Sequence, residues 1–101
     1  MIFMKIRATF SKSGDMRFIS HLDLMRLFSR ALRRAVLPVR ITKGFSPRLK
    51  VSVKRALRLG IESENEELDV CMAERIEQNF FIESLNKNLP NGIRIKRVEE
   101  F

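Results

Sequence analysis

Two hydrophobic periods alternate along this chain, and their order limits the folds that the chain can adopt. Residues 2–10 place an apolar side chain at every second position, which is the spacing of a strand with one buried face. Residues 20–37 instead repeat apolar side chains at intervals of three and four, which is the spacing of an amphipathic helix. Because such a strand and such a helix each bury only one side, they must pack on each other. The sequence therefore predicts layers of helix and sheet.

The first helix is expected between Ser20 and Leu37. Ser20 is a good N-cap, and Asp23 follows three residues later, where a carboxylate meets free amides and the positive end of the helix. Leu37 is expected to end the helix, because Pro38 pushes the residue before it out of the helical region. The apolar face that is predicted to enter the core consists of Leu24, Met25, Phe28, Ala31, Leu32 and Ala35.

Strand spacing returns after this helix. Residues 39–42 predict a short strand that a Gly-Phe-Ser-Pro turn closes, and the alternation resumes over residues 48–61. Arg55 interrupts the inner row of this second strand and indicates a bulge or a bend. A polar turn is expected over residues 60–65, and residues 67–72 predict the strand that returns, so that these strands form a hairpin.

The remaining residues predict a second helix and a closing strand. Apolar residues at helical spacing indicate a helix over residues 76–89, with Asn79 as a candidate cap, and Pro90 to Gly92 stops it. Ile93 and Ile95 then alternate with basic residues. The resulting order in 101 residues is that of the ferredoxin-like split βαββαβ fold, an α+β arrangement in which an antiparallel sheet carries both helices on one face. The length fits one domain over residues 1–101.

The charge of the chain points to partners that carry phosphate. Twenty Lys and Arg against 12 Asp and Glu give a net charge of +8 and a pI of about 10.6. Such a balance favours nucleic acid first and an anionic membrane second. The alternative is a basic protein that is merely soluble, because net charge bears on solubility and non-specific binding and not on fold.

Several classes of protein are excluded by composition. Cys71 is the single cysteine, so the chain alone can form neither a disulfide nor a cysteine-based zinc site, and no cluster of residues predicts a metal site or a cofactor site. Lys5 and Arg7 break the apolar run at the N-terminus, so a signal peptide is not expected. No stretch approaches the roughly 20 apolar residues of a membrane span. The expected location is the cytoplasm.

Two basic surfaces are predicted. On the first helix, Arg26, Arg30, Arg33 and Arg34 fall outside the apolar face, and like charges four residues apart repel each other, so this stripe favours a bound anion. On the sheet, the positions between the apolar rows should form an open basic face that only Glu67 and Asp69 relieve, although a solvated surface of cross-strand pairs is the alternative. That face would contain Lys5, Arg7, Thr9, Arg40, Thr42, Lys50, Ser52, Lys54, Arg94 and Lys96. Its lysines and arginines other than Arg40, together with the helix arginines, are the predicted RNA contacts, and the two sets should lie on opposite sides of the domain.

Loops supply further candidate contacts. The free amides after Ser20 could hold a phosphate, with ordinary helix capping as the alternative. His21, the single histidine, could act as a general base in RNA cleavage, contact a phosphate or a base, or serve a structural role at the helix start. Lys43, Phe45 and Arg48 surround the predicted turn, where Phe45 could either stack on an unpaired base or plug the edge of the core.

Several segments carry a family resemblance: SHLDLMRLFSRALRRAVLPV, GFSPRLKVS, LRLGIES with E-x-L-D-V, and LNKNLPNGIRI. Between Phe10 and Ile95 they resemble the bacterial DUF2344 family, a radical-SAM-linked domain of uncharacterised function. Members of that family occur as C-terminal extensions of radical SAM proteins or as separate proteins encoded near them, and its longer members continue well beyond the length of this chain. The resemblance therefore implies a radical SAM enzyme as partner. It does not imply that this chain is such an enzyme, because the three-cysteine cluster motif is absent.

Three functions follow as hypotheses. The first is a non-catalytic RNA-binding module that presents structured RNA, such as a tRNA or rRNA element, to a radical SAM enzyme. The second is a metal-independent endoribonuclease that uses His21. The third is a protein-docking domain whose charge meets an acidic partner. Exposed sheet edges also make a homodimer an option.

Overall fold

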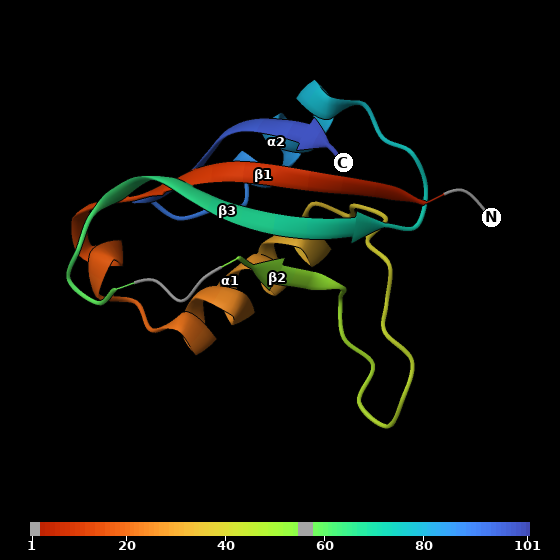
Figure 1. Cartoon of the computed structure of the whole chain (residues 1–101), viewed down its shortest axis with the longest axis horizontal. Helices are drawn as coiled ribbons and strands as arrows, with labels where there is room; N and C mark the ends of the chain where they lie inside the picture. Colours follow the sequence, from red (N-terminus) through yellow and green to blue (C-terminus); the bar gives the residue numbers. More distant parts are fainter. Residues whose placement is uncertain (1–2, 55–57) are drawn as a thin grey trace.

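The computed structural model describes residues 3–54 and 58–101. In chain order its elements are β1 (Met4–Lys12), the 3-10 helix η1 (Gly14–Phe18), α1 (His21–Arg34), β2 (Val51–Val53), β3 (Ser63–Met72), α2 (Gln78–Asn86) and β4 (Ile93–Glu100). The strands form one antiparallel sheet in the order β2-β3-β1-β4. Both helices lie on one face of this sheet, and the other face is open (Figure 1). The predicted ferredoxin-like α+β fold is confirmed.

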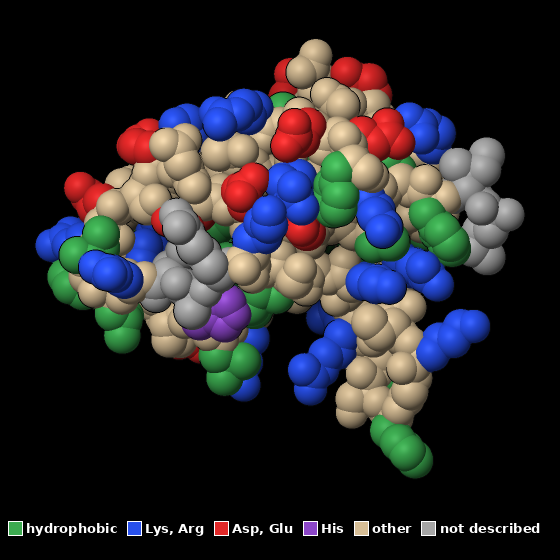
Figure 2. All heavy atoms as spheres, viewed as in Figure 1, with side chains coloured by type: hydrophobic (Ala, Val, Ile, Leu, Met, Phe, Trp, Pro, Cys, Tyr) green, Lys and Arg blue, Asp and Glu red, His purple; other side chains and the backbone are tan. Residues whose placement is uncertain are grey.

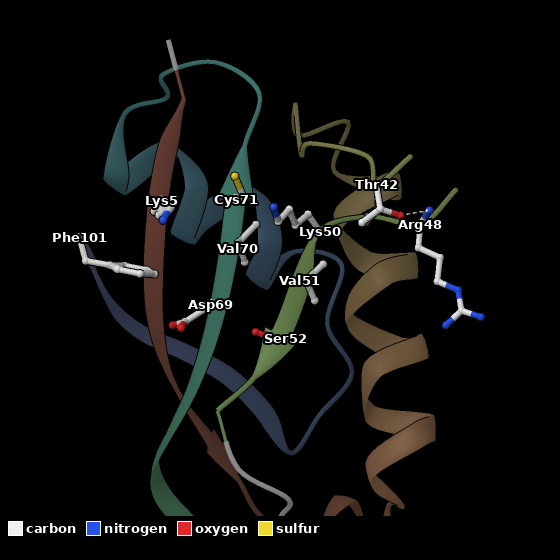
Figure 3. A pocket seen from close by; sticks show the side chains of 11 residues that line it. Lys5, Thr42, Arg48, Lys50, Val51, Ser52, Asp69, Val70, Cys71 and Phe101 are labelled. Atoms are coloured by element: carbon white, nitrogen blue, oxygen red, sulfur yellow. Dashed lines mark hydrogen bonds between the residues drawn. The ribbon is translucent and has the colours of Figure 1, made fainter. Parts of the chain in front are cut away.

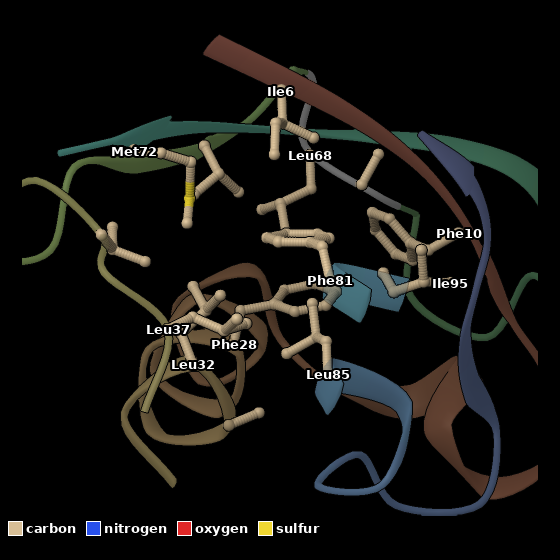
Figure 4. Packing of buried hydrophobic residues seen from close by; sticks show 14 of the residues in the cluster. Ile6, Phe10, Phe28, Leu32, Leu37, Leu68, Met72, Phe81, Leu85 and Ile95 are labelled. Carbon is tan, nitrogen blue, oxygen red and sulfur yellow. The ribbon is translucent and has the colours of Figure 1, made fainter. Parts of the chain in front are cut away.

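The core lies between the sheet and the two helices. The inner row of β1 is buried as its alternation predicted, and Phe10 meets Phe28 of α1 edge to face with ring centroids 4.9 Å apart. Phe81 and Leu85 supply the buried face of α2 (Figure 4). Each such side chain contributes about 1.5–3 kcal/mol when it leaves water. Packing of the helix layer on the sheet therefore fixes where the outward faces of α1 and the sheet point.

The start of α1 is confirmed, but its predicted end is wrong. The Ser20 hydroxyl accepts a hydrogen bond from the Asp23 amide at 3.1 Å. Four residues of the predicted apolar face are fully buried, while Met25 and Ala35 are partly buried. The helix ends at Arg34, before the proline, because Val36 adopts a left-handed conformation with φ of 54° and turns the chain away from the helix axis.

The second helix is shorter than predicted and has a different cap. Glu77, not Asn79, is the N-cap, and its carboxylate accepts hydrogen bonds from the amides of Asn79 and Phe80 at 3.0 and 2.7 Å. A carboxylate at this position meets both the free amides and the helix dipole. At the other end, the Asn86 amide group donates to and accepts from the Ile95 backbone at 3.0 and 2.8 Å. This pair of bonds fastens α2 to β4.

The edge of the sheet beside α1 differs most from the prediction. Among the described residues of this edge, regular strand geometry is limited to β2, although the sequence predicted a strand over residues 48–61. Val39 forms an isolated β-bridge with Met72, and the chain then leaves the sheet. A second isolated β-bridge, between Ile41 and Leu49, joins the two ends of the segment that projects. We call residues 41–49 the edge hairpin. It projects from the body of the molecule next to β2 (Figure 1).

Residues around the following turn also depart from the prediction. Leu59 and Ile61 are more than half exposed, so they do not continue the inner row of the sheet. β3 begins at Ser63, within the region that was predicted as a turn. The predicted bulge at Arg55 and the inner position predicted for Leu57 lie outside the described residues.

Candidate functional site

A groove separates α1 from the edge of the sheet. It has a volume of about 610 Å³. Side chains three, four and seven residues apart share one face of a helix, and this face of α1 turns toward the edge hairpin and β2. The lining consists of Leu22, Met25, Arg26, Ser29, Arg30 and Arg33 from α1, and of Arg48, Leu49 and Val51 from the opposite side. The groove thus combines apolar side chains with four arginines.

One of the four arginines of this groove, Arg26, has a carboxylate neighbour in the described part of the chain. Arg30, Arg33 and Arg48 are exposed, and none of them forms an ion pair with any carboxylate in the described ranges. Arg26 lies 3.6 Å from the Asp23 carboxylate, but both side chains are more than 60% exposed, so solvent weakens this pair. Like charges at such spacing cost an isolated helix about 0.2–0.5 kcal/mol per pair. A bound anion would remove that cost.

The edge hairpin forms the far wall of the groove and has a closed neck. The Thr42 amide donates to the Arg48 carbonyl at 2.7 Å, and the Arg48 amide donates to the Thr42 hydroxyl at 3.1 Å. Phe45 is fully exposed, so of its two alternatives the plug at the edge of the core is wrong. Figure 2 shows the hairpin as a projection that carries basic side chains and a hydrophobic side chain at its tip. The exposed ring of Phe45 is free to stack on another flat group.

A second hollow lies on the other side of the same hairpin, on the open face of the sheet (Figure 3). Its volume is about 450 Å³. Lys5 of β1 and Lys50 line it together with Asp69, Cys71 and other residues of β3 and the edge. Arg48, Leu49 and Val51 line both this hollow and the α1 groove, so this segment is the wall between them.

The open face of the sheet is charge-balanced near its centre. The Arg7 guanidinium donates two hydrogen bonds to the Asp69 carboxylate, at 2.8 and 3.1 Å. This bidentate contact, with the charges of Asp69, Glu67 and Glu99, holds the pKa of Arg7 above its ordinary value despite partial desolvation. Arg7 also lies over the Phe101 ring, 4.3 Å from its centroid. Arg7 is therefore already occupied by partners within the protein.

Other cations of this face are also paired. Lys54 lies 3.9 Å from Glu67, and Lys96 lies 3.1 Å from Glu64. The prediction that only Glu67 and Asp69 relieve the basic face is wrong, because β4 runs to Glu100 and places Glu99 opposite Arg7. Basic and acidic side chains are interspersed across the view of this face in Figure 2.

The remaining members of the predicted sheet surface differ in their exposure and in their neighbours. Thr9 is buried, so it is not part of an open face. Lys96 falls where the register of β4 shifts against β1, between the partners of Thr9 and Phe10. Arg94 is exposed and lies opposite Ser11. The Arg40 guanidinium lies over the Phe3 ring at 4.1 Å.

The start of α1 offers less than its sequence suggested. The Ser20 side chain is committed to the helix cap, and His21 is the exposed first residue of α1. Among the residues that the structure describes, no three His, Cys, Asp or Glu side chains are placed to hold a metal ion. Neither described helix is long and apolar enough to span a membrane.

The four helix arginines do not all line the groove. Arg26, Arg30 and Arg33 line it, whereas Arg34 lines a second hollow beside Lys87 and Pro90, at the end of α2, which Arg30 also borders. Sequence reasoning missed the apolar part of the groove. The sequence feature that could have indicated this apolar part is Leu22, a residue of α1 that lies outside the predicted core face and is 58% exposed.

Comparison with known proteins identifies a family but no characterised relative. Neither a curated protein nor a solved structure matches the chain. One family model, described as "Uncharacterized protein conserved in bacteria (DUF2344)", matches residues 5–101. Because this match covers nearly the whole chain, the protein belongs to the DUF2344 family.

Proposed function

We propose that this protein is a non-catalytic RNA-binding module that holds RNA phosphates in the α1 groove. One observation carries the proposal: Arg30, Arg33 and Arg48 converge on one groove with no carboxylate paired to them in the described parts of the chain. A planar guanidinium binds phosphate through two parallel hydrogen bonds, so three such groups suit a ligand with repeated phosphates.

Features around the arginines favour RNA over a simple anion. The groove also contains apolar side chains, among them Leu22 and Met25, which a small hydrated anion would not contact. Phe45 offers an exposed ring at the tip of the edge hairpin. Proteins that bind unpaired RNA combine basic grooves with aromatic side chains on which bases stack. The groove and the hairpin together have both kinds of group.

The partner protein is part of the same proposal. The family resemblance implies a radical SAM enzyme, and we propose that this module presents RNA to that enzyme for modification or processing. The α1 groove would face the RNA, which leaves the ion-paired part of the open face, around Lys54 with Glu67 and Lys96 with Glu64, for a protein partner. A surface of ion-paired side chains suits a protein interface, because charged side chains of the partner can form new ion pairs in place of the existing ones.

Binding of total small RNA to the purified protein in a salt series tests this function. We expect log affinity to fall linearly with log salt, with a slope of about −2 if three arginines contact single-stranded phosphates. Anionic lipid vesicles serve as the control for charge alone. Binding that does not depend on salt, or equal binding to the vesicles, would contradict the proposal.

The recovered RNA separates the other two hypotheses. Mapped ends that carry a 2′,3′-cyclic phosphate, and that disappear in His21→Ala, would replace the module with an endoribonuclease. Affinity for an acidic protein without measurable RNA binding would replace it with a docking domain. Intact, enriched RNA supports the module and identifies its ligand.

A further inference from the structure

We infer that the site takes single-stranded RNA, with phosphates in the α1 groove and one unpaired base in the hollow on the sheet side of the edge hairpin. This inference rests on the proposed function, and it adds the form of RNA and a base subsite. It follows from the position of the two hollows, from the chemistry of the second one and from the shape of an RNA duplex.

The two hollows are neighbours. Arg48, Leu49 and Val51 line both of them, so only one segment of backbone with its side chains separates the arginines of α1 from the open face of the sheet. In Figure 3 the Arg48 side chain runs beside α1, whereas Lys50 extends the other way, toward Cys71. A ligand that crosses this wall meets cationic side chains on both sides. The two basic sets, which the sequence places on opposite sides, are thus connected around the sheet edge.

The sheet-side hollow has the features of a base-binding pocket. Its apolar lining includes Leu49 and Val51, which are partly buried against the core, and the half-exposed ring of Phe101, and its volume of about 450 Å³ falls within the usual range for small-ligand pockets. Ser52 and Asp69 add a hydroxyl and a carboxylate to the lining. Flat apolar surfaces bind the face of a base, and the two polar groups can accept hydrogen bonds from its edge.

Asp69 is held in a fixed position, which suits it for reading a base edge. Its two carboxylate oxygens accept hydrogen bonds from Arg7 at 2.8 and 3.1 Å. A carboxylate has about four lone-pair sites, so these two bonds leave acceptor capacity for an exocyclic amine. The pairing with Arg7 also compensates its charge, so that a neutral base can approach without meeting an isolated anion.

The geometry disfavours a duplex. In a duplex the bases are stacked and paired inside the helix, and the major groove of RNA is too deep and narrow for side chains to read. A base can enter a pocket only after it is unpaired and unstacked, which is far more costly in a duplex than in a single strand. A single strand can also turn around the wall at Arg48. Phe45 would stack only on a base that is already exposed.

Fluorescence anisotropy with three labelled probes tests the inference: a 12-nucleotide single strand, the same sequence in a closed duplex, and the same strand with one abasic position. The key variant is Ser52→Trp, which fills the sheet-side hollow from an exposed strand position. Asn65→Trp is the matched control, because Asn65 is exposed on β3 and lines neither hollow. Thermal melts confirm that both variants fold.

We expect the single strand to bind at least 10-fold more tightly than the duplex, and Ser52→Trp to weaken it about fivefold while Asn65→Trp leaves it unchanged. Equal or tighter binding of the duplex, or an unchanged affinity in Ser52→Trp, would overturn the single-strand inference while the RNA-binding function stands. If no probe binds even at low salt, the proposed function itself is wrong, and this inference falls with it.

Discussion

The open face of the sheet and the α1 groove both carry cations, but they differ in how those cations are neutralised. On the sheet, Arg7 is held by Asp69, and Lys54 and Lys96 each lie within reach of a glutamate. In the groove, Arg30 and Arg33 have no acidic partner in the described ranges. A count of basic residues therefore does not locate a binding site. Pairing across strands and helices decides which positive charge remains available to a ligand.

Removing cations from the groove, but not from the sheet, should give the largest loss of RNA affinity. The double variant Arg30→Ala, Arg33→Ala takes two unpaired cations from the groove, and we expect RNA affinity to fall by at least 10-fold and the salt slope to flatten by about 1.4. The matched variant Lys54→Ala, Lys96→Ala removes the same charge from the sheet and should weaken binding less than twofold. Anisotropy titrations of both variants check this. Equal losses would remove the distinction between the two regions.

The exposed aromatic residue of the edge hairpin should give the next largest effect. Phe45→Ala is expected to weaken RNA binding about fivefold, because base stacking on an aromatic ring contributes about 1–3 kcal/mol. Its salt slope should not change, since no phosphate contact is lost. Phe80→Ala is the control, because Phe80 is a half-exposed phenylalanine on α2 far from the hairpin in sequence. A similar loss in both variants would contradict a role specific to the hairpin.

Removing acidic partners from the sheet should increase the affinity for RNA. The double variant Glu64→Gln, Glu67→Gln frees Lys96 and Lys54 from their ion pairs, and we expect RNA affinity at low salt to rise about two- to threefold. Glu74→Gln, Glu83→Gln raises the net charge by the same amount at exposed positions without an ion pair in the described ranges. If the control rises equally, overall charge and not local pairing sets the affinity.

The smallest effect on binding is expected from a change that stabilises α1 without altering charge. Val36→Gly relieves a β-branched residue at φ of 54°, and we expect the free energy of unfolding to rise by roughly 0.5–1 kcal/mol. Urea denaturation measures this. Ala35→Gly is the control, because Ala35, the C-cap of α1, has an ordinary right-handed φ of −75° that favours Ala over Gly, so its replacement should destabilise the protein. RNA affinity should stay within twofold in both variants, whereas a large change would tie binding to helix stability.

Local patterns predicted the elements of the fold well. The Ser20 cap, the buried face of α1 and the inner row of β1 all follow from spacing, because each depends on residues that are neighbours along one element. The element ends were less predictable. Glu77 displaced Asn79 as a cap, and Val36 ended α1 before Pro38 could. Several residues near a helix end can serve as its cap, and contacts with other elements select one.

The candidate site was predicted in its residues but not in its arrangement. The groove arginines and Arg48 were all named from the sequence, yet nothing in their spacing indicated that the edge hairpin lies across from α1. The sequence also gave no reason to separate Arg34 from Arg33. These two side chains follow each other on a helix, where one residue turns the direction by about 100° and so sends neighbours to different surfaces.

The order of helices and strands, the core faces and the excess of positive charge can all be read from the amino-acid sequence. Each of these is a property of composition or of spacing within one segment. Which charges are neutralised, and where the unpaired ones meet, depends on the three-dimensional packing of the chain. Ion pairs such as Arg7 with Asp69 join residues that are 62 positions apart, and the groove exists only because the sheet brings the edge hairpin beside α1. Availability for binding is therefore a property of the packed molecule, because it depends on distances between segments that the chain order does not fix.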